Sequence, residues 1–138
     1  MRIKSIELTP KDAVDIVVGA IEGGTAYWAE CRGYRWRNWY RDGGESGLSP
    51  DMLRDIPRDE VLVEVREDAE LTDPERSPNS WFPITIEELE RGVSLALARY
   101  PQLFSTINGS GDDVELDLDA IGCDVITQLT VFGRVVYG

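Results

Sequence analysis

Apolar residues recur at the spacing of an α-helix in three separate parts of the chain. The first series follows Thr9-Pro10, which provides a capping hydroxyl and a proline at the first helical position. Its apolar members are Val14, Val17, Val18 and Ile21. At Gly23-Gly24 either the helix ends, or the glycines let a neighbouring backbone approach while the helix continues. Because Gly24 and Trp28 extend the same face, we expect the helix to continue through Trp28.

Two further helices are predicted from their caps and apolar stripes. Thr85 and Glu88 have the spacing of a capping box. The stripe that follows is Ile86, Leu89, Val93 and Leu97, and Pro101 is expected to end this helix. The last helix is predicted to take Asp117 as its cap. Its apolar side is expected to consist of Leu118, Ile121, Val125, Leu129, Phe132 and Val136.

Strands are predicted where polar and apolar residues alternate. In residues 60–67, Val61, Val63 and Val65 alternate with Glu60, Leu62, Glu64 and Arg66. In residues 34–41, Tyr34, Trp36 and Tyr40 would point one way and Arg35, Arg37, Trp39 and Arg41 the other. We therefore expect residues 1–138 to form one α+β domain, with three main helices packed on a small antiparallel sheet that includes 34–41 and 60–67.

Composition narrows the classes of function. The 138 residues carry a net charge of -12, which disfavours direct binding of duplex nucleic acid through a broad basic face. There are two cysteines, and no segment resembles a signal peptide or a membrane span, so we expect a cytoplasmic protein with reduced thiols. The chain has no histidine, the commonest general base and metal ligand. No nucleophile–base pair or metal motif is visible, and we expect a non-enzymatic protein without catalytic residues, metal or cofactor.

The main candidate chemistry is a basic, aromatic segment in this acidic chain. Residues 32–41 hold four of the fourteen basic residues and no acid. Guanidinium groups bind phosphate, and tryptophan rings stack on bases and cations. The candidate ligand-binding residues are Tyr27, Trp28, Trp36 and Trp39 for stacking and Arg35, Arg37 and Arg41 for neutralising phosphate. In the alternative, the arginines pair with Glu60 and Glu64 across the sheet, and the aromatic residues serve the core.

Acidic side chains provide a second candidate surface. Asp112, Asp113, Glu115, Asp117, Asp119 and Asp124 form one run, and Glu87, Glu88 and Glu90 form another. Such a surface is able to imitate DNA phosphates and block a basic, nucleic-acid-binding host protein. The alternative is a solvated face with helix caps, which is what charge runs are in most proteins.

Three segments of the chain resemble a known group of proteins. The segments are Glu22-Gly23-Gly24-Thr25-Ala26-Tyr27-Trp28, then Trp81 with Ile84-Thr85-Ile86-Glu87-Glu88-Leu89-Glu90-Arg91-Gly92, and then Asp119-Ala120 with the stretch from Asp124 through Gln128, Phe132-Gly133 and Tyr137-Gly138. Together they resemble a family of small, acidic, uncharacterised bacteriophage proteins that carry an EGG-x-x-YW helix and a C-terminal Q-x-x-x-F-G-x-x-x-Y-G helix. The resemblance implies a phage accessory protein, without an agreed activity or catalytic residues.

The residues and the resemblance together lead to one expected function and two alternatives. We expect a phage protein in the host cell cytoplasm that acts against bacterial defence by non-catalytic binding, sequestering a small anionic ligand such as a nucleotide immune signal. The first alternative is an acidic inhibitor or DNA mimic that binds a basic host protein. The second is a homo-oligomer interface built on the glycine-containing first helix.

Overall fold

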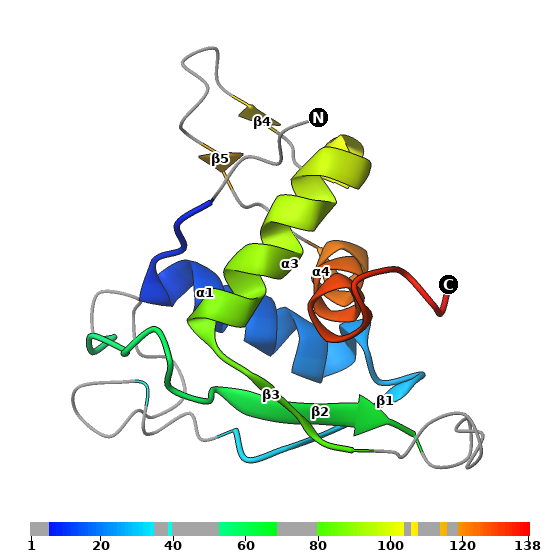
Figure 1. Ribbon diagram of the computed structural model, residues 1–138, viewed down its shortest axis with the longest axis horizontal. Coiled ribbons are helices and arrows are strands. Elements are labelled where there is room, and N and C mark those ends of the chain that lie inside the picture. The colour runs from blue at the N-terminus through cyan, green and yellow to red at the C-terminus, as the bar shows by residue number, and fades with distance from the viewer. Residues whose placement is uncertain are drawn as a thin grey trace.

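The computed structural model describes residues 6–34, 39, 53–68, 80–103, 106–107, 114–115 and 119–138. Within these ranges the long helices are α1 (Pro10–Gly19), α3 (Ile86–Arg99) and α4 (Ala120–Phe132). They lie together on one side of a small sheet (Figure 1). The predicted α+β class, with helices packed on an antiparallel sheet, is therefore confirmed. No helix in the described ranges is long and apolar enough to cross a membrane.

The sheet is antiparallel and has the strand order β1 (Ala29–Arg32), β2 (Val63–Glu67) and β3 (Phe82–Ile84). Its register pairs Cys31 with Val65, and Val65 with Phe82. Because side chains alternate across a strand, Val63 and Val65 point into the core beneath the helices. The residues that alternate with Val63 and Val65 along β2 point to the outer face of the sheet. A separate two-stranded ladder joins β4 (Thr106–Ile107) to β5 (Val114–Glu115).

The first helix ends earlier than predicted. After α1 comes a single π-helical turn, Ala20–Gly24, in which Gly23 leaves helical geometry at φ 172° and ψ -22°. Thr25 closes this turn, because its N–H and its hydroxyl both donate to the carbonyl of Ala20. The expected continuation through Trp28 is therefore wrong: Trp28 directly precedes β1.

The glycines of the first helix allow close packing within the chain. A Cβ on Gly24 would lie 2.5 Å from the carbonyl oxygen of Ala120 at the start of α4. A Cβ on Gly19 would lie 2.5 Å from the sulfur of Cys123, also on α4. Any larger side chain would push the two segments apart. In this structure Gly19 and Gly24 therefore make room for α4 of the same chain.

The strand predicted in residues 60–67 is confirmed for Val63–Glu67, and most of the segment 34–41 lies outside the described residues. The alternation in residues 60–67 gives β2, which starts at Val63. For residues 34–41 only Tyr34 and Trp39 are described; Tyr34 follows β1, and Trp39 is helical. In the described part of the sheet, β2 pairs with Ala29–Arg32 on one side and with Phe82–Ile84 on the other. Arg35, Trp36, Arg37 and Arg41 lie outside the described residues.

The helix after Thr85 is confirmed, and the last helix differs in detail. The Thr85 hydroxyl accepts the N–H of Glu88 at 3.2 Å and caps α3. The cap of α4 is Asp119, two residues after the predicted one, and α4 ends at Gly133 in the left-handed region (φ 74°). Ile121 is 68% exposed, whereas Ile126 and Leu129 are buried. Of the predicted apolar side, Leu129 is therefore in the core and Val125 and Phe132 pack against it, whereas Ile121 does not belong to it. Because α4 is covered on several sides, it buries polar residues as well.

Candidate functional site

Two of the predicted stacking residues belong to the core. Trp28 is 0% exposed and Trp39 is 2% exposed, so neither indole ring presents a face on which a ligand stacks. The ring of Trp28 lies 5.6 Å from that of Tyr137 in a stacked arrangement and 5.3 Å from that of Phe132. The assignment of Trp28 and Trp39 as ligand-stacking residues is corrected: burial of their large apolar area stabilises the fold.

Tyr27 is partly exposed, and a hydrogen bond fixes its hydroxyl group. Its side chain is 52% exposed, and its hydroxyl donates to the carboxylate of Asp124 at 2.6 Å. Partial burial, together with this hydrogen bond, raises the pKa of Tyr27 to about 12. The phenol therefore stays protonated at neutral pH and remains a donor to Asp124.

A buried polar cluster surrounds Asp124. Its carboxylate also accepts the indole N–H of Trp28 at 2.7 Å and the side-chain amide of Gln128 at 3.1 Å. Gln128 in turn bonds to the backbone of Tyr137. Tyr27 and Trp28 come from residues 22–28, and the other three residues come from residues 119–138. The structure thus brings these separated segments into one hydrogen-bonded cluster.

An arginine–tryptophan cluster occupies the outer face of the sheet. The guanidinium carbons of Arg32 and Arg66 lie 4.1 Å and 4.3 Å from the ring centroid of Trp81. Arg32 belongs to β1, Arg66 to β2, and Trp81 immediately precedes β3. Cation–π contacts of this kind hold guanidinium groups beside an aromatic ring. None of these three residues was among the predicted ligand-binding residues, although Arg32 belongs to the basic segment 32–41.

Carboxylates accompany both guanidinium groups on this face. Arg66 bonds to one oxygen of Glu30 through Nε at 2.8 Å and Nη2 at 2.7 Å. Arg32 makes a longer contact, 3.4 Å, with Glu64. Of the two acids proposed as partners for the arginine-rich segment, Glu64 therefore pairs with Arg32, and Glu60 pairs with Arg54.

The site residues predicted from the sequence did not include Trp81 and Arg66. The signal for Arg66 was its position on the polar side of the alternating strand 60–67. The signal for Trp81 was an aromatic residue two positions before Pro83, at the start of an edge strand. Their meeting with Arg32 depends on the order and register of three strands, which the local pattern does not contain.

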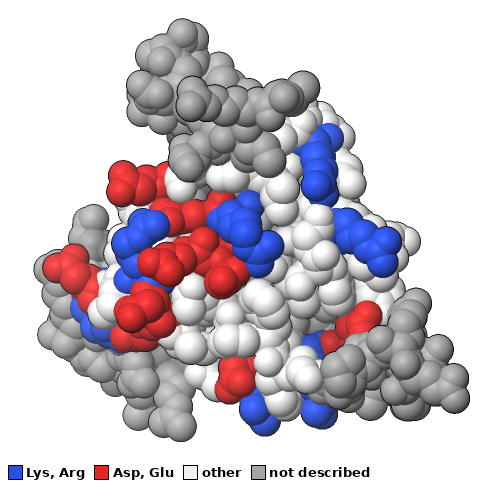
Figure 2. Space-filling view, viewed as in Figure 1, with Lys and Arg blue, Asp and Glu red and all other residues white. Residues whose placement is uncertain are grey.

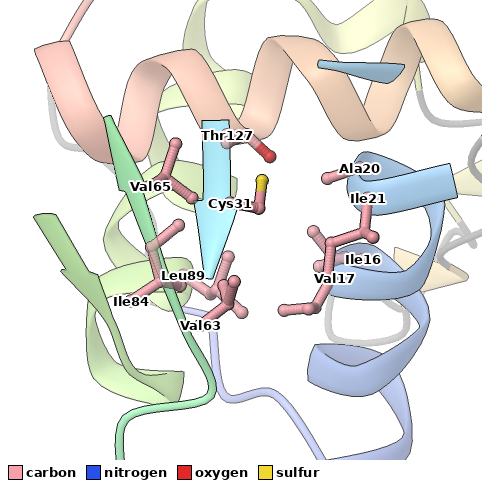
Figure 3. A pocket seen from close by; sticks show the side chains of 10 residues that line it. All are labelled: Ile16, Val17, Ala20, Ile21, Cys31, Val63, Val65, Ile84, Leu89 and Thr127. Carbon is pink, nitrogen blue, oxygen red and sulfur yellow. The ribbon is translucent and has the colours of Figure 1, made fainter. Parts of the chain in front are cut away.

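A small void lies on the inner side of the sheet, between the sheet, α1 and α4 (Figure 3). Its volume is about 10 Å³, room for roughly one water molecule. Cys31 points into it from β1, facing Thr127 of α4, and apolar side chains form the remaining wall. Burial raises the pKa of the Cys31 thiol, so the thiol stays protonated at neutral pH. This void is a gap in packing, too small and too apolar for an anionic ligand.

The described surface carries charges of both signs, interleaved on the face shown in Figure 2. Near the start of α3, Arg58 pairs with Glu90, and Arg91 pairs with Glu88. Glu90 also accepts the N–H of Leu8, which ties the chain preceding α1 to α3. Within the described ranges no group of acids and cysteines has the arrangement of a metal site.

Comparison with known proteins adds no relative: no family model, no curated protein and no solved structure matches this chain. The strongest feature is the arginine–tryptophan cluster, which places two cations and a large π surface on a face formed by three strands. Such a cluster is suited to bind a small anion that also has a flat ring.

Proposed function

We propose that this protein acts by non-catalytic binding of a small anionic, nucleotide-like ligand, and that the arginine–tryptophan cluster forms part of the binding site. The observation that carries the proposal is the placement of Arg32 and Arg66 within 4.1 Å and 4.3 Å of the Trp81 ring. A nucleotide has the two matching features, phosphate oxygens for guanidinium N–H groups and a base for the indole.

The two arginines have different roles in this proposal. Arg66 is fixed by two short hydrogen bonds to Glu30, so it positions the Trp81 ring, and the Glu30 carboxylate largely neutralises its charge. The side chain of Arg32 is 53% exposed, and its contact with Glu64 is 3.4 Å long. An ion pair of that length is weak at a solvent-exposed position. A phosphate oxygen can replace Glu64 at little cost, so Arg32 is the group that binds the ligand.

Arg32 is the first of the four arginines between residues 32 and 41, and it lies on β1, beside Trp81 at the outer face of the sheet. Arg35, Trp36, Arg37 and Arg41 remain candidate ligand-binding residues on the strength of the sequence, and they lie outside the described residues. Trp28 and Trp39 belong to the core.

The biological setting of the proposal comes from the resemblance to phage proteins. A non-catalytic binder made during infection would act in the host cell cytoplasm, and removal of a nucleotide signal would weaken host defence. Sequestration requires only affinity and sufficient protein, because a ligand held on the protein is withdrawn from its receptor. This setting matches a chain with phosphate-binding side chains and no catalytic motif in its sequence.

Calorimetry against a panel of cyclic and linear nucleotides tests the proposal. At least one nucleotide should bind the unmodified chain, and Arg32→Ala should weaken that binding by about ten- to a hundred-fold, the loss of one charge-assisted hydrogen bond. Arg134→Ala is the matched control, since it removes an exposed arginine of equal charge that lies after α4. Absence of binding across the panel, or equal losses in both variants, would reject the site.

An acidic, protein-binding inhibitor is the second candidate, favoured by the charge balance. Most described cations are already in ion pairs, namely Lys11, Arg32, Arg54, Arg58, Arg66 and Arg91. The net charge of -12 is then carried by exposed acids such as Glu22, Asp59 and Glu87, which suits a basic host protein. A host-lysate pull-down at low and high salt tests this candidate. A complex that survives high salt unchanged would count against electrostatic mimicry.

A further inference from the structure

The segment that follows α4 is held almost entirely by side chains from elsewhere in the fold. Residues 134–138 form no helix or strand. Gln128 on α4 contacts this segment through both ends of its amide. Its Oε1 accepts the N–H groups of Val136 and Tyr137, both at 2.8 Å, and its Nε2 donates to the carbonyl of Tyr137 at 2.9 Å. Gln128 is fully buried, so its amide recognises the backbone of an extended segment independently of that segment's side chains.

The side chain of Tyr137 is recognised separately. Its ring is stacked on Trp28, with an interplanar angle of 10°, and its hydroxyl donates to Glu67 at 2.7 Å. Glu67 is a buried residue at the end of β2. An aromatic face combined with a carboxylate acceptor selects tyrosine over phenylalanine, because phenylalanine would leave the buried acceptor without its partner.

The groups that hold Tyr137 are themselves anchored without it. Asp124 accepts hydrogen bonds from both Trp28 and Gln128, at 2.7 Å and 3.1 Å, which fixes the indole and the amide in place. Trp28 and Glu67 lie at the same end of the paired strands β1 and β2, because the register pairs Ala29 with Glu67 and Asp68 donates its N–H to the Trp28 carbonyl at 2.7 Å. The site is therefore preorganised by the core, and the segment 134–138 is what fills it.

We propose that Trp28, Glu67 and Gln128 form a binding site for an extended, tyrosine-bearing segment of a partner protein, and that residues 135–137 occupy this site in the isolated chain. The sequence pattern that this site recognises follows from residues 135–137. The first position is apolar, because Val135 packs on the core; the second accepts any residue, because Val136 is exposed; and the third is tyrosine. This site is separate from the arginine–tryptophan cluster, and it does not depend on the function proposed above.

Tyr137→Ala in the full chain and a synthetic peptide test the proposal. The probe is acetyl-Arg-Val-Val-Tyr-Gly-amide, which copies residues 134–138. The variant should bind this peptide, and the unmodified chain should bind it at least about ten-fold more weakly, because its site is occupied. The phenylalanine analogue should bind about five- to ten-fold more weakly than the tyrosine peptide. No binding to the variant, or equal binding of an alanine analogue, would overturn the proposal.

Amide hydrogen exchange on the unmodified chain gives a test that needs no variant. The N–H groups of Val136 and Tyr137 should exchange through local opening, at least about ten-fold faster than that of Leu129 in α4, and excess peptide should accelerate them. Exchange of all three only through global unfolding would mean that the site is never vacated, which contradicts the proposal. A dimer in which two copies swap residues 134–138 and which does not bind the peptide would also overturn the proposal that the site binds a partner protein.

Discussion

Replacing Asp124 by alanine should destabilise the fold far more than the loss of one surface charge. Asp124 is buried, and its carboxylate accepts three donors: the Trp28 indole at 2.7 Å, the Tyr27 hydroxyl at 2.6 Å and the Gln128 amide at 3.1 Å. It connects α4 to the chain that precedes β1. The variant removes the acceptor and leaves all three donors to find other partners.

The loss of this acceptor costs a different amount of free energy for each of the three donors. The Trp28 N–H has no access to water, so leaving it unpaired costs about 1–3 kcal/mol. The Gln128 amide keeps the Tyr137 carbonyl at 2.9 Å, and the half-exposed Tyr27 hydroxyl can turn to water, so their losses are smaller. With the space left by the carboxylate, we expect a loss of about 2–4 kcal/mol in the free energy of unfolding. Asp124→Asn keeps an acceptor for Trp28 and should lose only about 1 kcal/mol.

Urea denaturation followed by tryptophan fluorescence measures these differences. The matched control is Asp15→Ala, which removes the same charge from an exposed acid paired with Lys11 at 2.8 Å. A surface ion pair of this kind is worth about 0–1 kcal/mol. If Asp124→Ala lost no more stability than Asp15→Ala, or if the alanine and asparagine variants of Asp124 behaved alike, the role assigned to the buried cluster would be refuted.

Three more predictions follow from named contacts. Gly92→Ala should destabilise the chain by about 1–3 kcal/mol despite the better helix propensity of alanine, because its Cβ would lie 2.0 Å from the Thr130 hydroxyl. Thermal unfolding measures this loss, and the double variant with Thr130→Ala should recover part of it. Thr85→Ala should lose about 1 kcal/mol by removing the α3 cap, measured in urea, and an unchanged midpoint would contradict it. The raised pKa values, about 11 for the buried Cys123 thiol and about 12 for Tyr27, mean that the unfolded chain loses these protons first, so stability should fall as pH rises from 9 to 12. Tyr27→Phe should flatten the part of that decline above pH 10, and an unchanged pH profile would show that Tyr27 does not contribute.

Local signals in the sequence were sufficient where one segment decides the outcome. The helix α3 is determined by the Thr85 cap and its own apolar stripe, and β2 by its own alternation. The end of the first helix was not determined in this way, because Trp28 continues a helical face in sequence. In the fold, Trp28 is buried against Phe132 and Tyr137, more than a hundred residues along the chain.

The sequence did not identify Arg66 and Trp81 as members of the arginine–tryptophan cluster, and the predicted residues Arg35, Trp36, Arg37 and Arg41 lie outside the described residues. The sequence indicated arginine with tryptophan, and one of the arginines in the basic segment, Arg32, does lie beside an indole. Which tryptophan faces outward depends on strand pairing, because β1 and β2 must align before Arg32 and Arg66 reach Trp81. Trp39 illustrates the opposite case, since its position beside arginines suggested a ligand-binding role and the fold buries it.

The indole N–H resonances of the four tryptophans give the most direct test of the proposed binding site. In a titration with the nucleotide that binds best in calorimetry, followed by nitrogen–proton correlation spectra, the Trp81 resonance should shift in proportion to occupancy. The resonances of the buried Trp28 and Trp39 should stay in place. Arg32→Ala should move the midpoint of this shift to about ten- to a hundred-fold higher ligand concentration. A Trp81 resonance that does not move at saturation, or a shift confined to Trp28 and Trp39, would contradict the account.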